Sequence, residues 1–185
     1  GRGPLRHGDP PSRVLRAETG AGARGSVLRG DMSAVCAAQG LRAERLSESE
    51  MPAFRRALTE ALLPTDDLDR PGRHFFRFDA ASGETLGYGG FELYASHVLL
   101  RSIVVLPRHR GHGIGERIVQ ELMAQAHGAG ARQAYLLTTT AQSYFERLGF
   151  RSVDRASAPE AILATTQAEG LCPASAKLLT KMMIQ

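Results

Sequence analysis

A glycine-rich turn near the middle of the chain has the residue types of an anion-binding site. Glycines at alternate positions let the backbone approach a ligand closely and point successive N–H groups at one place, and a helix start adds the positive end of its dipole. Such a corner suits a pyrophosphate, and Arg108 and His109 add positive charge beside it. The turn reads Arg110, Gly111, His112, Gly113, Ile114, Gly115 and Glu116, shortly after the apolar residues Ile103, Val104 and Val105.

Arg101 is the second residue with a chemical implication. It lies between two leucines and Ile103, and an arginine buried among apolar residues needs a partner for its charge. A substrate carboxylate would suit it. Glu92 or Glu84 would serve as a structural partner instead.

The segments around these residues alternate between strand-like and helix-like patterns, which predicts an α/β (α+β) domain rather than a helical bundle or a β-sandwich. Three consecutive strands with short turns should form an antiparallel meander. The double glycine Gly89-Gly90 in the middle strand indicates a bulge or a close backbone approach. The expected strands are 41–46, 74–79, 85–94, 98–106, 134–138 and 176–183, and the expected helices lie between Ser47 or Ser49 and Pro64, at 114–126, at 141–148 and after Pro159.

The turn matches the coenzyme A signature of the GNAT N-acetyltransferases, which the chain resembles over about residues 41–155. That signature is Gln or Arg, two residues, Gly, one residue, then Gly or Ala, and here it runs from Arg110 to Gly115. A second block is also similar: the strand 134–138 and a helix that ends in Leu148-Gly149-Phe150. The dinucleotide-binding fold also uses a strand, a glycine-rich turn and a helix, but it would need parallel strands from the outset and an acidic residue ending the next strand.

The resemblance implies the GNAT fold, a mixed and mostly antiparallel sheet flanked by helices. It implies that acetyl-CoA is the cosubstrate and is held at a splayed strand pair. The backbone of residues 103–105 would pair with the pantetheine arm, and residues 111–116 would hold the pyrophosphate.

Catalysis by such an enzyme needs a base for the acceptor amine and an acid for the departing thiolate. An alkyl ammonium with a pKa near 10 is about a thousandfold more protonated than neutral at pH 7. In many GNAT enzymes the acid is a tyrosine four residues before the Gly of Gly-Phe, where this chain has Phe145. Tyr144, one position earlier, is a candidate acid, or it packs against the coenzyme or the core. The strand glutamate that some members use is missing, so Glu92 and His97 are the candidate bases.

Four segments narrow the resemblance to the arsenic-resistance acetyltransferases called ArsN. Related ArsN proteins acetylate the α-amino group of the glutamate-like antibiotics arsinothricin and phosphinothricin, which implies a small, anionic, amino-acid-like amine as substrate and a carboxylate for Arg101 to hold. Two other functions stay open: a protein or peptide N-acetyltransferase, favoured by the Tyr144-Phe145 pair, and a coenzyme A-binding domain without activity. The similar segments are 99–102, 136–141, 155–162 and 171–176.

Length and charge bound the domain organisation. The 185 residues, 43% hydrophobic, suffice for one sizeable core. We expect residues 1–40 to form a disordered leader rich in Gly, Pro and Arg, ahead of one domain at 41–185. The leader begins without a methionine, which fits a natural start near Met32 or a transit segment. Six arginines against three acidic residues in the first 31 give +3 of the net charge of +4, so we expect no nucleic-acid partner.

The remaining expectations concern compartment, metal and assembly. The chain has no apolar run of about eighteen residues and no secretory pattern, so we expect a cytoplasmic protein that does not enter a membrane. Cys36 and Cys172 then stay free thiols, with Cys172 a small buried residue rather than an arsenic contact. His109 and His112 lack a third ligand, so no metal site is expected. A homodimer stays open, because GNAT domains often dimerise.

Overall fold

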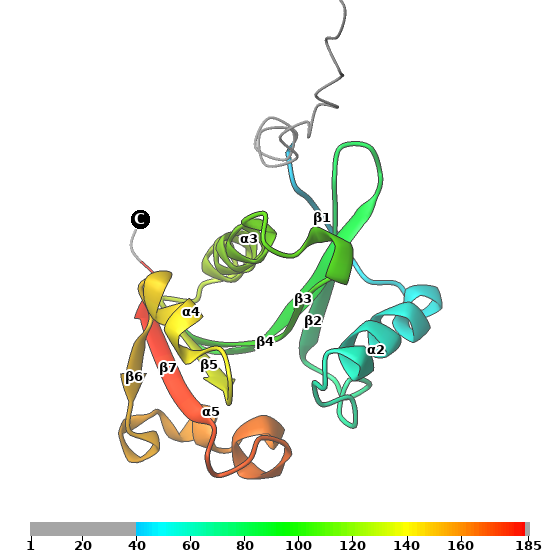
Figure 1. Cartoon of the computed structure of the whole chain (residues 1–185). Helices are drawn as coiled ribbons and strands as arrows, with labels where there is room; N and C mark the ends of the chain where they lie inside the picture. Colours follow the sequence, from blue (N-terminus) through cyan, green and yellow to red (C-terminus); the bar gives the residue numbers. More distant parts are fainter. Residues whose placement is uncertain (1–39, 184–185) are drawn as a thin grey trace, which may run out of the picture. The chain divides into compact units, whose positions relative to one another are not determined.

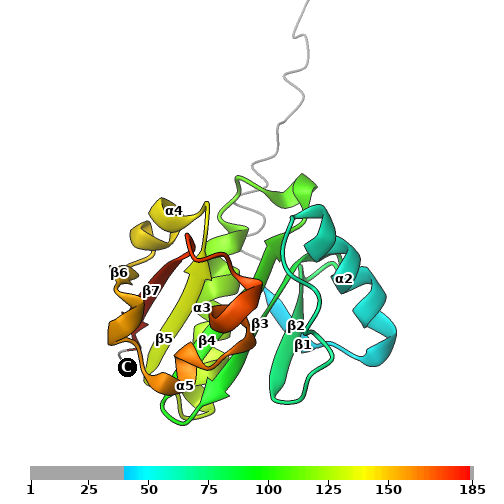
Figure 2. The same cartoon turned by 90° about the horizontal axis from the view of Figure 1, so that it is seen from below.

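A computed structural model describes residues 40–183, which form a seven-stranded mixed sheet with helices on both faces (Figures 1 and 2). The strands lie in the order β1-β2-β3-β4-β5-β7-β6. Residues 1–39, with Cys36, fall outside the described range. The expected leader and its boundary with the domain therefore remain predictions.

The first four strands form the antiparallel meander that the sequence predicts, because segments rich in apolar residues alternate with short polar turns. In the turn between the second and third strands, the N–H of Gly83 donates to the carbonyl of Ala80, and the φ of Gly83 is 86°. The strands are β1 (Arg42–Arg45), β2 (Arg73–Asp79), β3 (Thr85–Tyr94) and β4 (His97–Val105).

Helix α2 lies between β1 and β2 and starts at a capping box. The N–H of Ser47 donates to the Glu50 carboxylate at 2.9 Å, and a single 3-10 turn leads into the helix. The helix ends earlier than the stop expected at Pro64. It spans α2 (Met51–Glu60) and buries Phe54, Ala57 and Leu58.

The second half of the sheet is reached by a helical crossover, because parallel strands cannot be joined by a tight hairpin. Helix α3 (Ile114–Gly128) connects β4 to β5 (Gln133–Thr138), which runs parallel to β4. Helix α4 (Gln142–Arg147) follows, and the φ of 87° at Gly149 fits the predicted helix end.

The chain then adds an edge strand and a short helical insertion before the last strand. β6 (Arg151–Val153) pairs antiparallel with β7 (Lys177–Met182), which also pairs with β5. Between them lie α5 (Glu160–Leu163) and a π-helical turn (Gln167–Leu171). The sequence predicted α5 after Pro159, but it predicted neither β6 nor the π-helical turn.

The helices cover opposite faces of the sheet. α3 and α4 lie on one face, and α2 and α5 lie on the other (Figure 2). The larger core forms under α3 and α4 and includes Phe76, Leu100, Ile118, Leu122 and Phe145.

Two irregularities in β4 shape the centre of the sheet. β4 pairs with β5 over only three residues, His97–Leu99 against Gln133–Tyr135, and beyond them the strands no longer pair. On its other side, β4 has a bulge, because Ser102 and Ile103 both lie opposite Gly89, and Ser102 has a φ of 54°. The sequence indicated an irregularity at Gly89-Gly90, and the extra residue lies on the neighbouring strand.

The bulge changes which residues of β4 face which helices. Side chains of a strand normally alternate between faces, and one extra residue shifts that alternation by one. Ile103 and Val105 therefore share the α3 face with Leu100, while Arg101 and Val104 face α2.

Candidate active site

The gap between β4 and β5 holds a cavity of about 700 Å³. On the α3 and α4 side its wall includes Gly115, Tyr144 and Phe145. On the α2 and α5 side its wall includes residues 61–64, Asp66 and residues 171–173. The cavity therefore reaches both faces of the sheet, so two ligands could approach the same point from opposite sides.

The glycine-rich turn lies at the α3 side of this cavity. Gly111 and Gly113 have φ values of 80° and 73°, a region that strains other residues, and the space where their side chains would lie is open. α3 begins after Gly113 without a side-chain cap, so its first N–H groups are free of side-chain acceptors. The Arg110 Nε donates to the carbonyl of Val105 at 3.0 Å and holds the turn against the end of β4.

The structure brings most of the predicted site residues together. His112 and Glu116 are exposed on the turn and the first turn of α3, beside Gly111 and Gly113. Ile114 differs, because its side chain is 1% exposed and packs in the core, which leaves only its backbone for a ligand. The predicted residues that line the cavity are Arg101, Ile103, Val104, Val105, Arg110, Gly115 and Tyr144.

Tyr144 is a half-buried phenol on the cavity wall. Its ring packs edge-on against Phe145 with centroids 5.2 Å apart, and the Arg147 guanidinium lies 5.9 Å from its centre. Burial and then the charge of Glu116 raise the pKa of Tyr144, so the hydroxyl keeps its proton at neutral pH. Phe145 itself is buried and packs against Phe150.

Arg101 is fully buried, and its charge is balanced within the protein. Its two terminal nitrogens donate to the Asp67 carboxylate at 2.7 and 2.5 Å, one of them also donates to Glu92, and its Nε donates to Ser102 at 3.3 Å. Burial would lower the pKa of Arg101, but these carboxylates raise it and keep the guanidinium charged. The structural partner Glu92, foreseen as an alternative, is present, and Asp67 occupies the place expected for a substrate carboxylate.

Glu92, one of the two candidate bases, lies among charged and polar partners. Its carboxylate accepts a hydrogen bond from the Tyr94 hydroxyl at 2.5 Å and lies 3.2 Å from the Arg73 Nε, besides its contact with Arg101. Glu92 also lines a separate cavity of about 280 Å³ rather than the one that contains Tyr144.

His97, the other candidate base, lies at the closed end of the gap. It pairs with Gln133 where β4 and β5 still run side by side. Its ring lies 5.9 Å from that of Tyr135. It is not part of the cavity wall.

Sequence reasoning missed several residues that the fold brings to the site. Asp67 is 1% exposed, although it comes from a polar loop that reads as solvated. Its partner Arg101 is 34 residues away in sequence, so no local pattern could reveal it. Thr138–Thr140 also line the cavity. Cys172, expected as a small buried residue, is half-buried on the cavity wall, and burial raises the pKa of its thiol.

Two further findings apply to residues 40–183. No helix there is long and apolar enough to cross a membrane. Nor does that part of the chain gather three or more His, Cys, Asp or Glu side chains that could hold a metal ion.

The chain matches a known family over more than half of its length. The sequence profile described as "Acetyltransferase (GNAT) family" matches residues 42–150. A comparison with curated proteins finds no match. The fold is similar to that of a GNAT-family acetyltransferase from Staphylococcus aureus, with a TM-score of 0.61 and 15% identity over 77% of this chain and 99% of that chain.

Two further solved structures are similar. N-acetylglutamate synthase from Neisseria gonorrhoeae, complexed with coenzyme A and N-acetyl-glutamate, has a TM-score of 0.65 and 16% identity over 79% of this chain and 36% of that chain. A mutant spermidine N-acetyltransferase from Vibrio cholerae has a TM-score of 0.57 and 10% identity over 77% and 93%. At such identities the likeness establishes the fold, and it confirms the predicted fold class.

Proposed function

The chain belongs to the acetyltransferase (GNAT) family, and on that premise we propose that it transfers an acetyl group from acetyl-CoA to the amine of a small molecule. Acetyl-CoA is the acetyl donor of this family. The observation that supports the proposal most is the cavity between β4 and β5, which reaches both faces of the sheet. It gives the donor and the acceptor separate approaches to one point.

The donor side is the α3 side. We assign the pyrophosphate to the backbone N–H groups of residues 111–116, where the glycine φ values and the uncapped start of α3 favour an anion. Arg110, exposed beside the turn, adds positive charge. The pantetheine arm would lie along Ile103–Val105, since this part of β4 has no partner in β5.

The bound acetyl-CoA supplies an acetyl thioester at the centre of the cavity. We assign Tyr144 as the residue that donates a proton to the departing thiolate, because it lines the cavity and its raised pKa keeps it protonated. The acceptor amine gives up its proton to cavity water, because neither candidate base lines the cavity. The phenol is then reprotonated from solvent.

The acceptor is assigned to the α2 and α5 side of the cavity, whose extent suits a small molecule. Segments 99–102, 155–162 and 171–176 resemble ArsN. This resemblance supports an anionic, amino-acid-like acceptor and a role in resistance to arsenical or related antibiotics. Such a substrate would have to recruit Arg101 by displacing Asp67 from it. A cationic acceptor would meet Asp66 instead, an exposed carboxylate on the same wall.

A panel of amines tests the proposal and separates these acceptors. Thiol release from acetyl-CoA should be measured with phosphinothricin, arsinothricin, spermidine and a histone peptide. We expect release with at least one small amine and none above background with the peptide. If acetyl-CoA raises the melting temperature but no amine releases thiol, the chain is a binding domain without activity.

A further inference from the structure

The acceptor end of the cavity lies between two segments that are far apart in sequence. Residues 61–64 and Asp66, in the loop after α2, line one side, and residues 171–173, in the insertion before β7, line the other. Neither segment belongs to the sheet. The space between them therefore depends on whatever holds the loop and the insertion in place.

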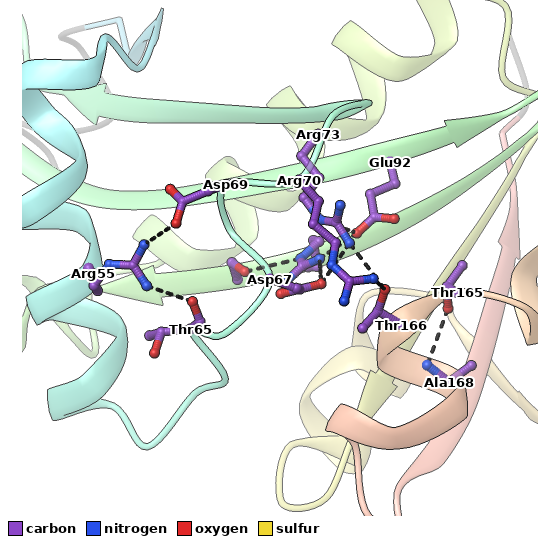
Figure 3. A network of polar contacts seen from close by, with 12 residues as sticks. Arg55, Thr65, Asp67, Asp69, Arg70, Arg73, Glu92, Thr165, Thr166 and Ala168 are labelled. Carbon is purple, nitrogen blue, oxygen red and sulfur yellow. Dashed lines mark hydrogen bonds and ion pairs between the residues drawn. The ribbon is translucent and has the colours of Figure 1, made fainter.

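Asp67 holds the loop to the sheet. Its carboxylate accepts hydrogen bonds from Arg101 of β4 and, at 2.7 Å, from Arg73 of β2 (Figure 3). The side chains of Asp67, Arg73 and Arg101 are 1%, 6% and 0% exposed. Asp67 is thus a buried carboxylate shared by two buried guanidiniums, and Glu92 balances the second positive charge.

Arg73 also reaches the insertion that forms the other side of the acceptor end. One terminal nitrogen of Arg73 bonds Asp67 and also lies 3.4 Å from the Thr166 hydroxyl, to which Arg70 donates at 3.3 Å (Figure 3). Inside the insertion, Arg155 donates to the carbonyls of Ala168, Pro173 and Ala176. Polar contacts therefore join the loop to the insertion at Thr166, and a separate set of contacts from Arg155 holds Pro173 within the insertion.

Nothing in this set of contacts equips it for proton transfer. Asp67 does not line the cavity that contains Tyr144, and its hydrogen-bonding capacity is taken up by two guanidiniums. A buried carboxylate with two such partners is fixed in position, because moving it would leave buried charges unpaired. Its geometry suits a support rather than a reactant.

We propose that Asp67 is a positioning residue that links the loop 61–72 to residues 164–176 of the insertion and so sets the width of the acceptor site. The link itself is a property of the fold, while its effect on the acceptor rests on the proposed function. Loosening it should weaken acceptor binding and leave the donor side, built on β4 and α3, unchanged.

Asp67→Asn tests the link because it keeps the size of the side chain and removes its charge. Asp69→Asn is the matched control: Asp69 lies in the same loop, is exposed and pairs with Arg55 of α2. In hydrogen exchange of the whole chain, we expect Asp67→Asn to speed exchange in both 61–72 and 164–176, and Asp69→Asn to leave 164–176 unchanged. Faster exchange confined to 61–72 would overturn the proposal.

Binding and kinetics test the consequence. For the amine with the highest turnover in the panel, we expect Asp67→Asn to raise KM by about tenfold or more, since small displacements of a binding wall are costly. The Kd for acetyl-CoA should not change. An unchanged acceptor KM, or an equal loss for both substrates, would contradict the positioning role.

A second variant keeps the test decisive if Asp67→Asn does not fold. Thr166→Val removes only the hydroxyl on the insertion side, and we expect it to loosen 164–176 and raise the acceptor KM. Wild-type behaviour of this variant would overturn the link. If the wild-type chain takes up no acetyl-CoA, the proposed function fails, and the exchange data still decide whether Asp67 joins the two segments.

Discussion

The hydroxyl of Tyr144 lies so close to Gly115 that a methyl group on Gly115 would come within 2.5 Å of the phenolic oxygen. The contact joins α4 to the first turn of α3 on the donor side of the cavity. The coenzyme A signature of the family accepts Gly or Ala at this position. In this chain, Ala at position 115 would require the Tyr144 side chain to shift.

We expect Gly115→Ala to displace the Tyr144 phenol and lower kcat by about tenfold, a typical cost of misplacing a reacting group. Stability should not fall for helical reasons, because Ala favours a helix over Gly. Thiol release measures the effect. In a Tyr144→Phe background, which lacks the oxygen, the same substitution should change little, and fully additive losses would contradict the contact.

Tyr144→Phe should lower kcat by about a hundredfold or more, the usual contribution of a positioned acid, without changing the Kd for acetyl-CoA. A proton donor works only while protonated, and burial raises the pKa of Tyr144 above its ordinary value of 10.0. The wild-type kcat should therefore hold until the pH exceeds about 10 and then fall as the phenol ionises. A Phe variant with wild-type kcat would remove Tyr144 from the mechanism.

Arg101→Ala should act mainly on stability. It removes one of the two guanidiniums that the buried carboxylates of Asp67 and Glu92 share, and breaking such a buried pair costs about 3–5 kcal/mol. Chemical denaturation measures the loss, with Arg110→Ala, an exposed arginine at the same cavity, as the control. A variant of normal stability that fails only with anionic amino acids would instead place Arg101 at the substrate carboxylate.

The Asp67 carboxylate should make stability depend on acid pH. Burial would raise the pKa of Asp67, but hydrogen bonds and charge from Arg101 and then Arg73 outweigh it and hold the pKa below its ordinary 3.8. A lowered pKa gives stability that is complete above 3.8 and is lost as the pH falls through the lower folded value. Urea unfolding between pH 2 and 7 should show this loss, and a profile with the same acid dependence in Asp67→Asn would contradict it.

The sequence predicted the elements well where a repeating pattern fixes them. Strand-like segments rich in apolar residues, with a turn at Gly83, predicted the meander, and helical spacing of apolar residues such as Ile118 and Leu122 predicted α3. β6 was not predicted, because its three residues are mostly exposed and carry no pattern of apolar residues. The bulge was indicated on β3, but its extra residue is Ser102 of β4, since the glycines show where backbones approach and not which strand gains a residue.

The donor side of the site could likewise be predicted from a local pattern, and the acceptor side could not. The donor turn is contiguous in sequence, so its glycines could be recognised before the fold was known. The acceptor side is assembled from distant segments, and its charges are paired across them. The sequence offered Glu92 or Glu84 as the partner of Arg101 and did not indicate Asp67, because only the folded chain places Asp67 against Arg101.

The most direct test of the account is calorimetric titration of the folded chain with acetyl-CoA. We expect saturable binding of one equivalent. Gly113→Ala should weaken it about tenfold, because Gly113 has a φ of 73° that costs another residue about 1–2 kcal/mol. Gly128→Ala, at the open end of α3, should bind like the wild type. If well-folded protein takes up no acetyl-CoA, or if Gly113→Ala binds it as tightly as Gly128→Ala, the turn at 111–116 is not the donor site.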